Sequence, residues 1–192
     1  MGKSGTFIML KNSALFILFS LSFIAGCKSP NEPPSRPQTF YPLAVGNKWY
    51  YNSITFNYGA VNLDTTTVNL VEEVTGVKVI DKKNYFEVTS TDLTSGTKDT
   101  TYYRMSCDTL FEIIAKYPEN IHADFSLNLN EQAYWDQDVK VTLKNDEYMT
   151  FETFVYDDSY SMTFKRGVGM INSIHYGYGD CQRTKLIKSE IK

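Results

Sequence analysis

Residues 148–165 read YMTFETFVYDDSYSMTFK, and this stretch decides the fold. Apolar and polar side chains alternate on both sides of the central Asp-Asp pair, which is the period of a β-strand interrupted by a turn. Side chains of one parity share a face and can pack on each other across the turn: Met149, Phe151 and Val155 before it, and Tyr160, Met162 and Phe164 after it. The stretch therefore predicts an antiparallel hairpin with one apolar face.

The same alternation continues through most of residues 39–192, with turn signals about every ten residues. Strand-like segments are 48–58, 65–80, 85–91, 98–106, 110–115, 139–143, 170–176 and 182–191, with a short strand near 125–129 inside the less regular stretch 117–137. No segment has the period of a long helix. We predict one all-β domain, an antiparallel meander of roughly nine or ten strands that forms a half-barrel, a barrel or a sandwich.

Residues 1–26 have the layout of an export signal. Lys3 and Lys11 precede an apolar run from Ala14 to Ile24, and small residues end it. The alternative is a retained transmembrane helix, which needs roughly 20 consecutive apolar residues. The run is shorter than that because Lys11 limits it on one side and Cys27 on the other. We therefore predict a signal peptide.

The end of this run, Ile24-Ala25-Gly26-Cys27, resembles the lipobox of bacterial lipoproteins. The resemblance implies that Cys27 becomes the mature N-terminus and carries acyl chains such as palmitate. Two or more chains give stable anchoring, so the membrane would be a partner of the protein. The alternative is a small buried cysteine in an uncleaved helix.

The lipidated cysteine is followed by a proline-rich linker, so that residues 27–38 are predicted to separate the anchor from the domain. Four of the six prolines of the chain lie in residues 28–37, which favours a semi-rigid stalk with a reach of roughly 30 Å. Lys28 and Ser29 lack the aspartate of inner-membrane retention. By analogy we expect the outer membrane of the bacterial cell envelope.

Two further stretches are similar to a known group. Residues 41–50 read YPLAVGNKWY and residues 167–171 read GVGMI. They resemble the PL-x-VGN-x-W-x-Y opening and the GVG-x-(I/V) closing motif of a group of uncharacterised bacterial lipoproteins. That resemblance implies a curved antiparallel sheet like the carriers of the LolA and LolB type, with no established activity. The long helices of those carriers are missing, and Lys165-Arg166 departs from the pattern of the group, so the resemblance does not extend to carrier function.

The opening motif also has a physical interpretation. Val45-Gly46-Asn47 is a turn-forming sequence that delivers Trp49 into the first strand. We expect the indole of Trp49 to plug the core.

Composition excludes several function classes. With 19 basic and 22 acidic residues the net charge is −3, so the basic footprint of a nucleic-acid-binding protein is absent. The two histidines, His122 and His175, have no ligand partner at metal-site spacing, and surface or half-buried positions are expected for both. The paired glycines lack the third glycine and helix of a dinucleotide site. We predict no metal, no cofactor and no catalytic residue.

Two cysteines remain after Cys27 is assigned to lipid. Cys107 and Cys181 lie at predicted hairpin ends, and an even pair in an oxidising compartment favours a disulfide. Two free thiols are the alternative.

Two function classes are compatible with these features. The first is a binding or assembly module of the cell envelope that recognises a lipid, another apolar ligand, or an envelope protein. Its predicted ligand face is Tyr103, Met105, Phe151, Tyr160, Met162 and Phe164. These side chains could instead simply fill the core. The second class is an envelope hydrolase whose site is assembled from scattered residues, which we consider the weaker alternative because no catalytic motif is present.

Overall fold

The computed structural model describes residues 39–192 except 58–65, 115–116, 137, 154, 156–157 and 178–179. The chain divides into two units, residues 1–35 and residues 36–192, and all described elements belong to the second. The predicted signal peptide 1–26, Cys27 and the linker 27–38 lie outside the described residues. Within the described part, no helix is long and apolar enough to span a bilayer.

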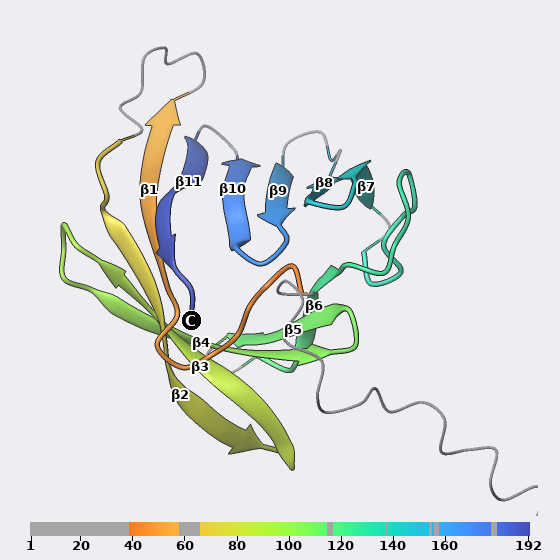
Figure 1. Cartoon of the computed structure of the whole chain (residues 1–192). Helices are drawn as coiled ribbons and strands as arrows, with labels where there is room; N and C mark the ends of the chain where they lie inside the picture. Colours follow the sequence, from red (N-terminus) through yellow and green to blue (C-terminus); the bar gives the residue numbers. More distant parts are fainter. Residues whose placement is uncertain are drawn as a thin grey trace, which may run out of the picture. The chain divides into compact units, whose positions relative to one another are not determined.

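In the described part of the chain, eleven strands form one antiparallel sheet (Figure 1). Their bounds are β1 Lys48–Asn57, β2 Leu70–Ile80, β3 Lys83–Asp92, β4 Lys98–Ser106, β5 Thr109–Ile114, β6 Asn120–Asp124, β7 Val139–Lys144, β8 Tyr148–Thr153, β9 Ser159–Lys165, β10 Gly169–Tyr176 and β11 Asp180–Glu190. Their order across the sheet is β6-β5-β4-β3-β2-β1-β11-β10-β9-β8-β7. The predicted all-β meander is confirmed, and of its alternatives the open half-barrel applies, because β6 and β7 are the two edges.

The first and last strands pair with each other in the middle of the sheet. Lys48 lies opposite Glu190, and Asn57 lies opposite Asp180. On each side of this central pair the strands follow one another as hairpins, from β2 to β6 and from β10 back to β7. Short-range pairing therefore builds each half, and the β1–β11 pairing joins the halves.

The stretch 117–137 differs from its prediction. Its strand is β6, Asn120–Asp124, and not 125–129. Phe125 and Leu127 follow the strand in turns, and both are buried in the core. The ammonium group of Lys144 donates to the carbonyl oxygens of Phe125 and Ser126, each at 3.2 Å. Phe125 and Leu127 thus show the alternation of a strand although they lie in a loop. Both side chains enter the core, and the lysine satisfies carbonyl groups of the loop.

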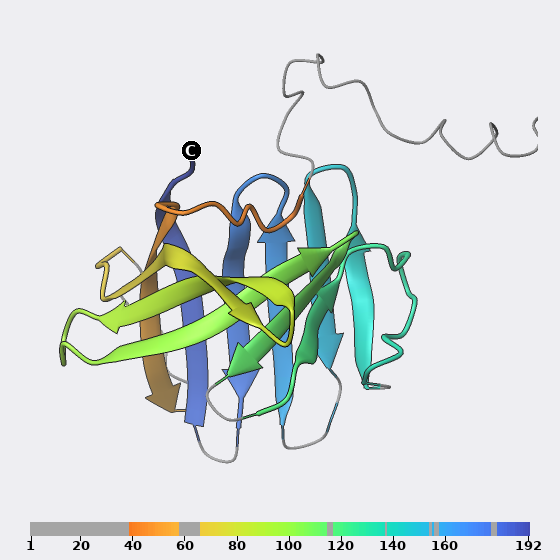
Figure 2. The same ribbon diagram turned by 90° about the horizontal axis from the view of Figure 1, so that it is seen from below.

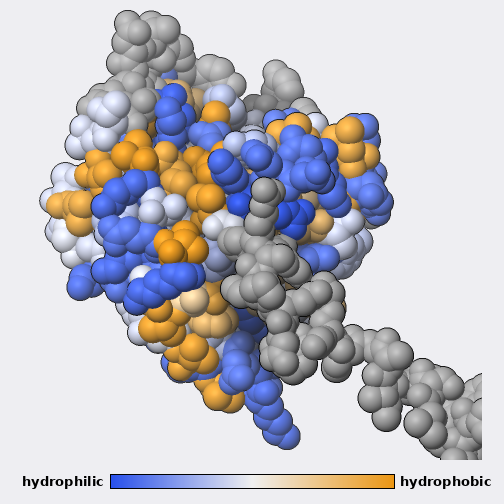
Figure 3. Space-filling model, viewed as in Figure 1, coloured by the Kyte–Doolittle hydropathy of each residue, from blue (hydrophilic) through white to orange (hydrophobic). Residues whose placement is uncertain are grey.

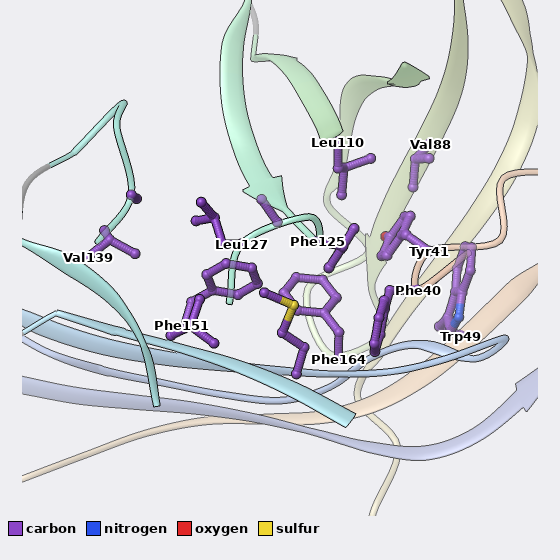
Figure 4. Close-up of a cluster of buried hydrophobic side chains, with 14 of the residues drawn as sticks. Phe40, Tyr41, Trp49, Val88, Leu110, Phe125, Leu127, Val139, Phe151 and Phe164 are labelled. Carbon is purple, nitrogen blue, oxygen red and sulfur yellow. The ribbon is translucent and has the colours of Figure 1, made fainter. Parts of the chain in front are cut away.

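The two halves of the sheet face each other across one hydrophobic core (Figures 2 and 4). The ring of Phe164 on β9 lies 5.1 Å from that of Phe125 and 6.2 Å from that of His122 on β6, as centroid distances. Residues 39–47 lie over the core before β1 begins, and within them Phe40 stacks on Phe125 at 5.0 Å. The core therefore combines side chains from both halves and from this covering segment.

The two sequence motifs meet at Trp49. Its indole is fully buried and stacks on Tyr41 at 5.2 Å, and its Nε1–H donates to the carbonyl oxygen of Val168. A Cβ atom at Gly169, where φ is +106°, would lie 2.9 Å from that nitrogen. Residues 41–50 and 167–171 therefore form one junction, and the predicted burial of Trp49 is confirmed.

Asn47 fixes the turn in front of Trp49. Its side chain is fully buried, its Nδ2 donates to the carbonyl oxygen of Pro42 at 2.8 Å, and its Oδ1 accepts from the backbone N–H of Lys192 at 2.9 Å. One amide thus ties the start of the domain to its end. This bond supports the central β1–β11 pairing.

The strand β2 extends beyond β1, because only Leu70–Glu73 pair with it. Along the projecting part Val77 is 55% exposed and Val79 is 66% exposed, and Figure 3 shows apolar side chains on this hairpin. The hairpin ends at Asp81 and Lys82, which have φ values of +48° and +65°.

The predicted disulfide between Cys107 and Cys181 is not formed. Both cysteines are free, with Cys107 exposed and Cys181 buried. Cys181 lies opposite Phe56 near the C-terminal end of β1, whereas Cys107 lies in the β4–β5 turn at the other end of the sheet. Both are at hairpin ends, as expected, but the register places those ends on opposite sides.

A cluster of charged side chains lies on the outer face of β3–β5. Glu119 accepts from Arg104 Nε, from Tyr85 Oη and, at 2.7 Å, from Lys83 Nζ. The guanidinium carbon of Arg104 lies 4.0 Å from the ring centroid of Phe111. The Arg104 hydrogen bond, followed by those from Lys83 and Tyr85, lowers the pKa of Glu119 from its ordinary value of 4.5 to about 2, although burial opposes the shift.

Glu119→Gln is therefore expected to destabilise the protein in a pH-dependent manner. A depressed carboxyl pKa stabilises the fold above pH 4.5, and this contribution is lost as the pH falls toward 2. Each pKa unit corresponds to about 1.4 kcal/mol, but solvent screens this cluster near the surface, so we expect a loss of about 1–2 kcal/mol at pH 7. Urea unfolding of both proteins at pH 7, 5, 4 and 3 measures it. A difference that stays constant over this range would contradict the assignment.

Candidate functional site

The six residues of the predicted ligand face lie on the interior side of the sheet, but they have two different environments. Phe151 and Phe164 are fully buried. Tyr103, Met105, Tyr160 and Met162 pack against the core and remain partly exposed. The first two therefore fill the core, and only the other four are available to contact a ligand.

The packing of Phe164 explains this division. Its ring centroid lies 5.1 Å from that of Phe125, 6.0 Å from that of Phe151 and 6.3 Å from that of Tyr41. Because the side chain of Phe164 is also fully buried, it presents no surface to a ligand.

A polar cluster lies on the interior side of β2–β6. Glu112 Oε2 lies 2.9 Å from His122 Nδ1, and the ring of His122 lies 5.6 Å from that of Tyr103. Glu112, His122 and Tyr103 are all half-buried. His122 occupies the extra position of a bulge, because Leu110 pairs with Ala123 while Phe111 pairs with Ile121. The bulge turns the imidazole toward the carboxylate of the neighbouring strand.

Glu72 on β2 adds a second carboxyl group. Its Oε1 lies 3.4 Å from Ser90 Oγ, and it also interacts with the hydroxyl of Tyr41. Burial raises the pKa of Glu72, although the bonds from Ser90 and Tyr41 and the charge of His122 oppose the shift. A carboxyl group in this environment retains its proton more readily than one in water.

The pKa of Glu112 is shifted in the opposite direction. Burial would raise it, but the hydrogen bond and charge of His122, together with the Tyr103 hydroxyl, outweigh burial and lower the pKa of Glu112. Burial and the charges of Glu72 and Glu112 raise the pKa of Tyr103 well above its ordinary value. Two carboxyl groups with opposite shifts beside a histidine form an arrangement that is common at functional sites.

A groove of about 480 Å³ lies where β8 ends and β9 begins. It is lined by Glu152, Thr153, Val155, Ser159, Tyr160, Ser161, Ile174 and Tyr176. Glu152 lies opposite Ser161, and Ser161 lies opposite Ile174, so these three side chains share the outer face of the sheet. The volume falls in the range of small-molecule sites, about 300–1,000 Å³.

Tyr160 connects the groove with the interior. It lines the groove and also packs against the core beside Met162. Burial, followed by the charges of Asp136 and Glu112, raises the pKa of Tyr160 to about 12. The carboxylate of the interior cluster therefore acts on a side chain of the groove wall.

The second histidine lies at the surface, as expected. His175 Nε2 lies 2.6 Å from Asp158 Oδ1, and both side chains are more than half exposed. Across the described ranges, no three His, Cys, Asp or Glu side chains come together as a metal site.

Sequence reasoning missed both the polar cluster and the groove. Glu112 and His122 are ten positions apart, and only the bulge between β5 and β6 brings them together. The groove combines the ends of three strands. Of its lining, the prediction included Tyr160 alone.

Comparison with known proteins adds little to this geometry. No protein-family model and no curated protein matches the chain. Among solved structures, the chain is similar to the crystal structure of a "putative lipoprotein" from Parabacteroides distasonis ATCC 8503, with 12% identity and a TM-score of 0.45. The alignment covers 81% of this chain and 100% of the other.

Proposed function

We propose that the protein is a lipid-anchored binding module of the bacterial cell envelope and that its ligand binds in the groove between β8, β9 and β10. The observation that carries the proposal is the groove itself, since its volume and mixed polar and aromatic lining are those of a ligand site. The fold supports it, because Phe151 and Phe164 are committed to the core and leave little interior surface for a large apolar ligand.

The membrane attachment in this proposal rests on the sequence. The apolar run before Cys27 and the proline-rich residues 28–37 favour a lipid anchor followed by a stalk. An outer-membrane position is proposed from the absence of an aspartate after Cys27. A stalk would leave the groove free to meet a ligand or a partner away from the lipid surface.

A hydrolase is the second candidate, and the interior cluster is the observation that favours it. Glu112 and His122 are hydrogen-bonded, and Glu72 nearby has a raised pKa. Such a pair could transfer a proton, with the histidine as base and Glu112 as its orienting partner. Both residues are half-buried, which makes access for a substrate less direct than access to the groove.

The binding function predicts that an envelope component stabilises the protein through the groove. Envelope extract would be separated into lipid-soluble and water-soluble fractions, and the melting temperature of the lipidated protein in phospholipid vesicles would be measured with each. A ligand at 100 times its Kd adds about 2.7 kcal/mol, which raises Tm by several degrees. We expect one fraction to do this for the wild type, and Glu152→Gln with Ser161→Ala to abolish most of the shift.

Leu143→Ala is the matched control, because this exposed side chain on β7 lies outside the groove. No shift with either fraction, or an equal shift in the groove variant, would refute the binding proposal. The hydrolase candidate has its own readout in the same samples. Chemical conversion of the stabilising component by the wild type, but not by Glu112→Gln, would favour it.

A further inference from the structure

The polar groups of the groove can form more hydrogen bonds than the protein uses. The hydroxyl of Thr153 is occupied, because its Oγ1 accepts from the backbone N–H of Tyr160 at 2.8 Å. Ser161 Oγ reaches Glu152 Oε1 only at 3.4 Å. Within the described part of the chain, the hydroxyl of Ser159 makes no hydrogen bond. Glu152 thus offers acceptors, and the hydroxyls of Ser159 and Ser161 can donate or accept.

The remainder of the lining is apolar or aromatic. Ile174, Val155 and the ring of Tyr176 stand beside the polar groups. A ligand that fits this lining presents hydroxyls on one side and C–H groups on the other. Tyrosine and serine together suit such ligands, since tyrosine adds rigid contact area and serine adds adaptable hydrogen bonds.

Charge narrows the class of ligand. Among the lining residues that the structure describes, Glu152 is the charged one. Lys140 on β7 lies opposite Glu152, and Arg183 on β11 lies opposite Ile174. Each basic residue is therefore one strand away from a lining residue, and neither lines the groove. Asp158, which precedes the lining residue Ser159, is paired with His175. The carboxylate inside the groove repels an anionic ligand, whereas a neutral ligand with many hydroxyls would find acceptors and donors there.

We infer that the groove recognises a neutral carbohydrate, with the carboxylate of Glu152 and the hydroxyls of Ser159 and Ser161 bonding sugar hydroxyls and with Ile174 and Tyr176 contacting the C–H face of a ring. This inference rests on the proposed function, because it names the ligand class of the same groove.

The test compares neutral and acidic sugars on the lipidated protein in phospholipid vesicles. Isothermal titration calorimetry at pH 7 would use maltotriose and the trimer of N-acetylglucosamine as neutral probes, and trigalacturonate as the acidic probe. We expect at least one neutral trisaccharide to bind more tightly than trigalacturonate. Glu152→Gln and the double variant Ser159→Ala with Ser161→Ala should each weaken that binding at least tenfold, whereas Leu143→Ala should leave it unchanged.

The groove variants change half-buried positions, and their melting temperatures establish whether they are folded. The inference is overturned if trigalacturonate binds at least as tightly as both neutral sugars, if no trisaccharide binds, or if neutral binding is insensitive to the groove variants. Its failure is distinguishable from that of the proposed function. An envelope fraction that still stabilises the wild type through Glu152 and Ser161 keeps the groove as the binding site and excludes only the sugar class.

Discussion

Trp49→Ala is expected to lower the free energy of unfolding by about 3–5 kcal/mol, the usual cost of removing a fully buried large aromatic side chain. The indole has 0% exposure, stacks on Tyr41 and donates to the carbonyl oxygen of Val168. Its removal would leave a cavity and an unpaired buried carbonyl group. For a domain of this size the loss corresponds to a decrease in Tm of roughly 10 °C.

The measurement is thermal and urea unfolding of the wild type and the variant. Trp135→Ala is the matched control, because it removes the other tryptophan of the chain, which is only partly buried at the margin of the core. We expect it to cost clearly less. Gly169→Val probes the same junction from the other side, since a Cβ atom there would meet the indole nitrogen at 2.9 Å and the backbone has a positive φ.

A Trp49→Ala variant that melts within one or two degrees of the wild type would contradict the junction. Equal losses for the two tryptophan variants would also contradict it, because the cost would then follow the residue type and not the burial of Trp49.

The class of the fold was predictable because side-chain alternation is a local property of the sequence. Residues 148–165 show this directly: the hairpin of β8 and β9 pairs Phe151 with Met162 and Met149 with Phe164 on one face. The central pairing of β1 with β11 was not predictable, because it joins residues more than 120 positions apart and leaves no periodic signal. The disulfide prediction was wrong for the same reason, since the relative positions of two hairpin ends depend on the order of the strands in the sheet.

The site was predictable only in part, for a related reason. Parity placed Tyr160 and Met162 on the interior side correctly, but it could not separate them from Phe164, whose aromatic neighbours come from the loop after β6 and from the covering segment. The pairing of Glu112 with His122 depends on one bulge. Register shifts are set by side-chain packing and turn geometry. A polar cluster across such a shift is therefore visible only in three dimensions.

The second large effect concerns location. Cys27→Ser is expected to move the protein from the membrane fraction to the soluble fraction, because a serine in place of the cysteine offers no thiol for the lipid. Anchoring by two or more acyl chains is stable, at about 0.8 kcal/mol per buried methylene, so its loss should be nearly complete. The released protein should keep the wild-type Tm, since Cys27 lies outside the described sheet. Fractionation, mass spectrometry and thermal unfolding measure the three quantities.

Cys107→Ser is the matched control for this prediction. It removes a thiol that is free and exposed in the β4–β5 turn, and it should leave the protein in the membrane fraction. The prediction would be contradicted if the mass of the wild-type protein still included residues 1–26 and the Cys27→Ser variant also stayed in the membrane fraction. The apolar run before Cys27 would then be a retained anchor and not a signal. The groove and the core would be unaffected by that result, because the sheet is built from residue 48 onward, but the proposed lipid attachment would be excluded.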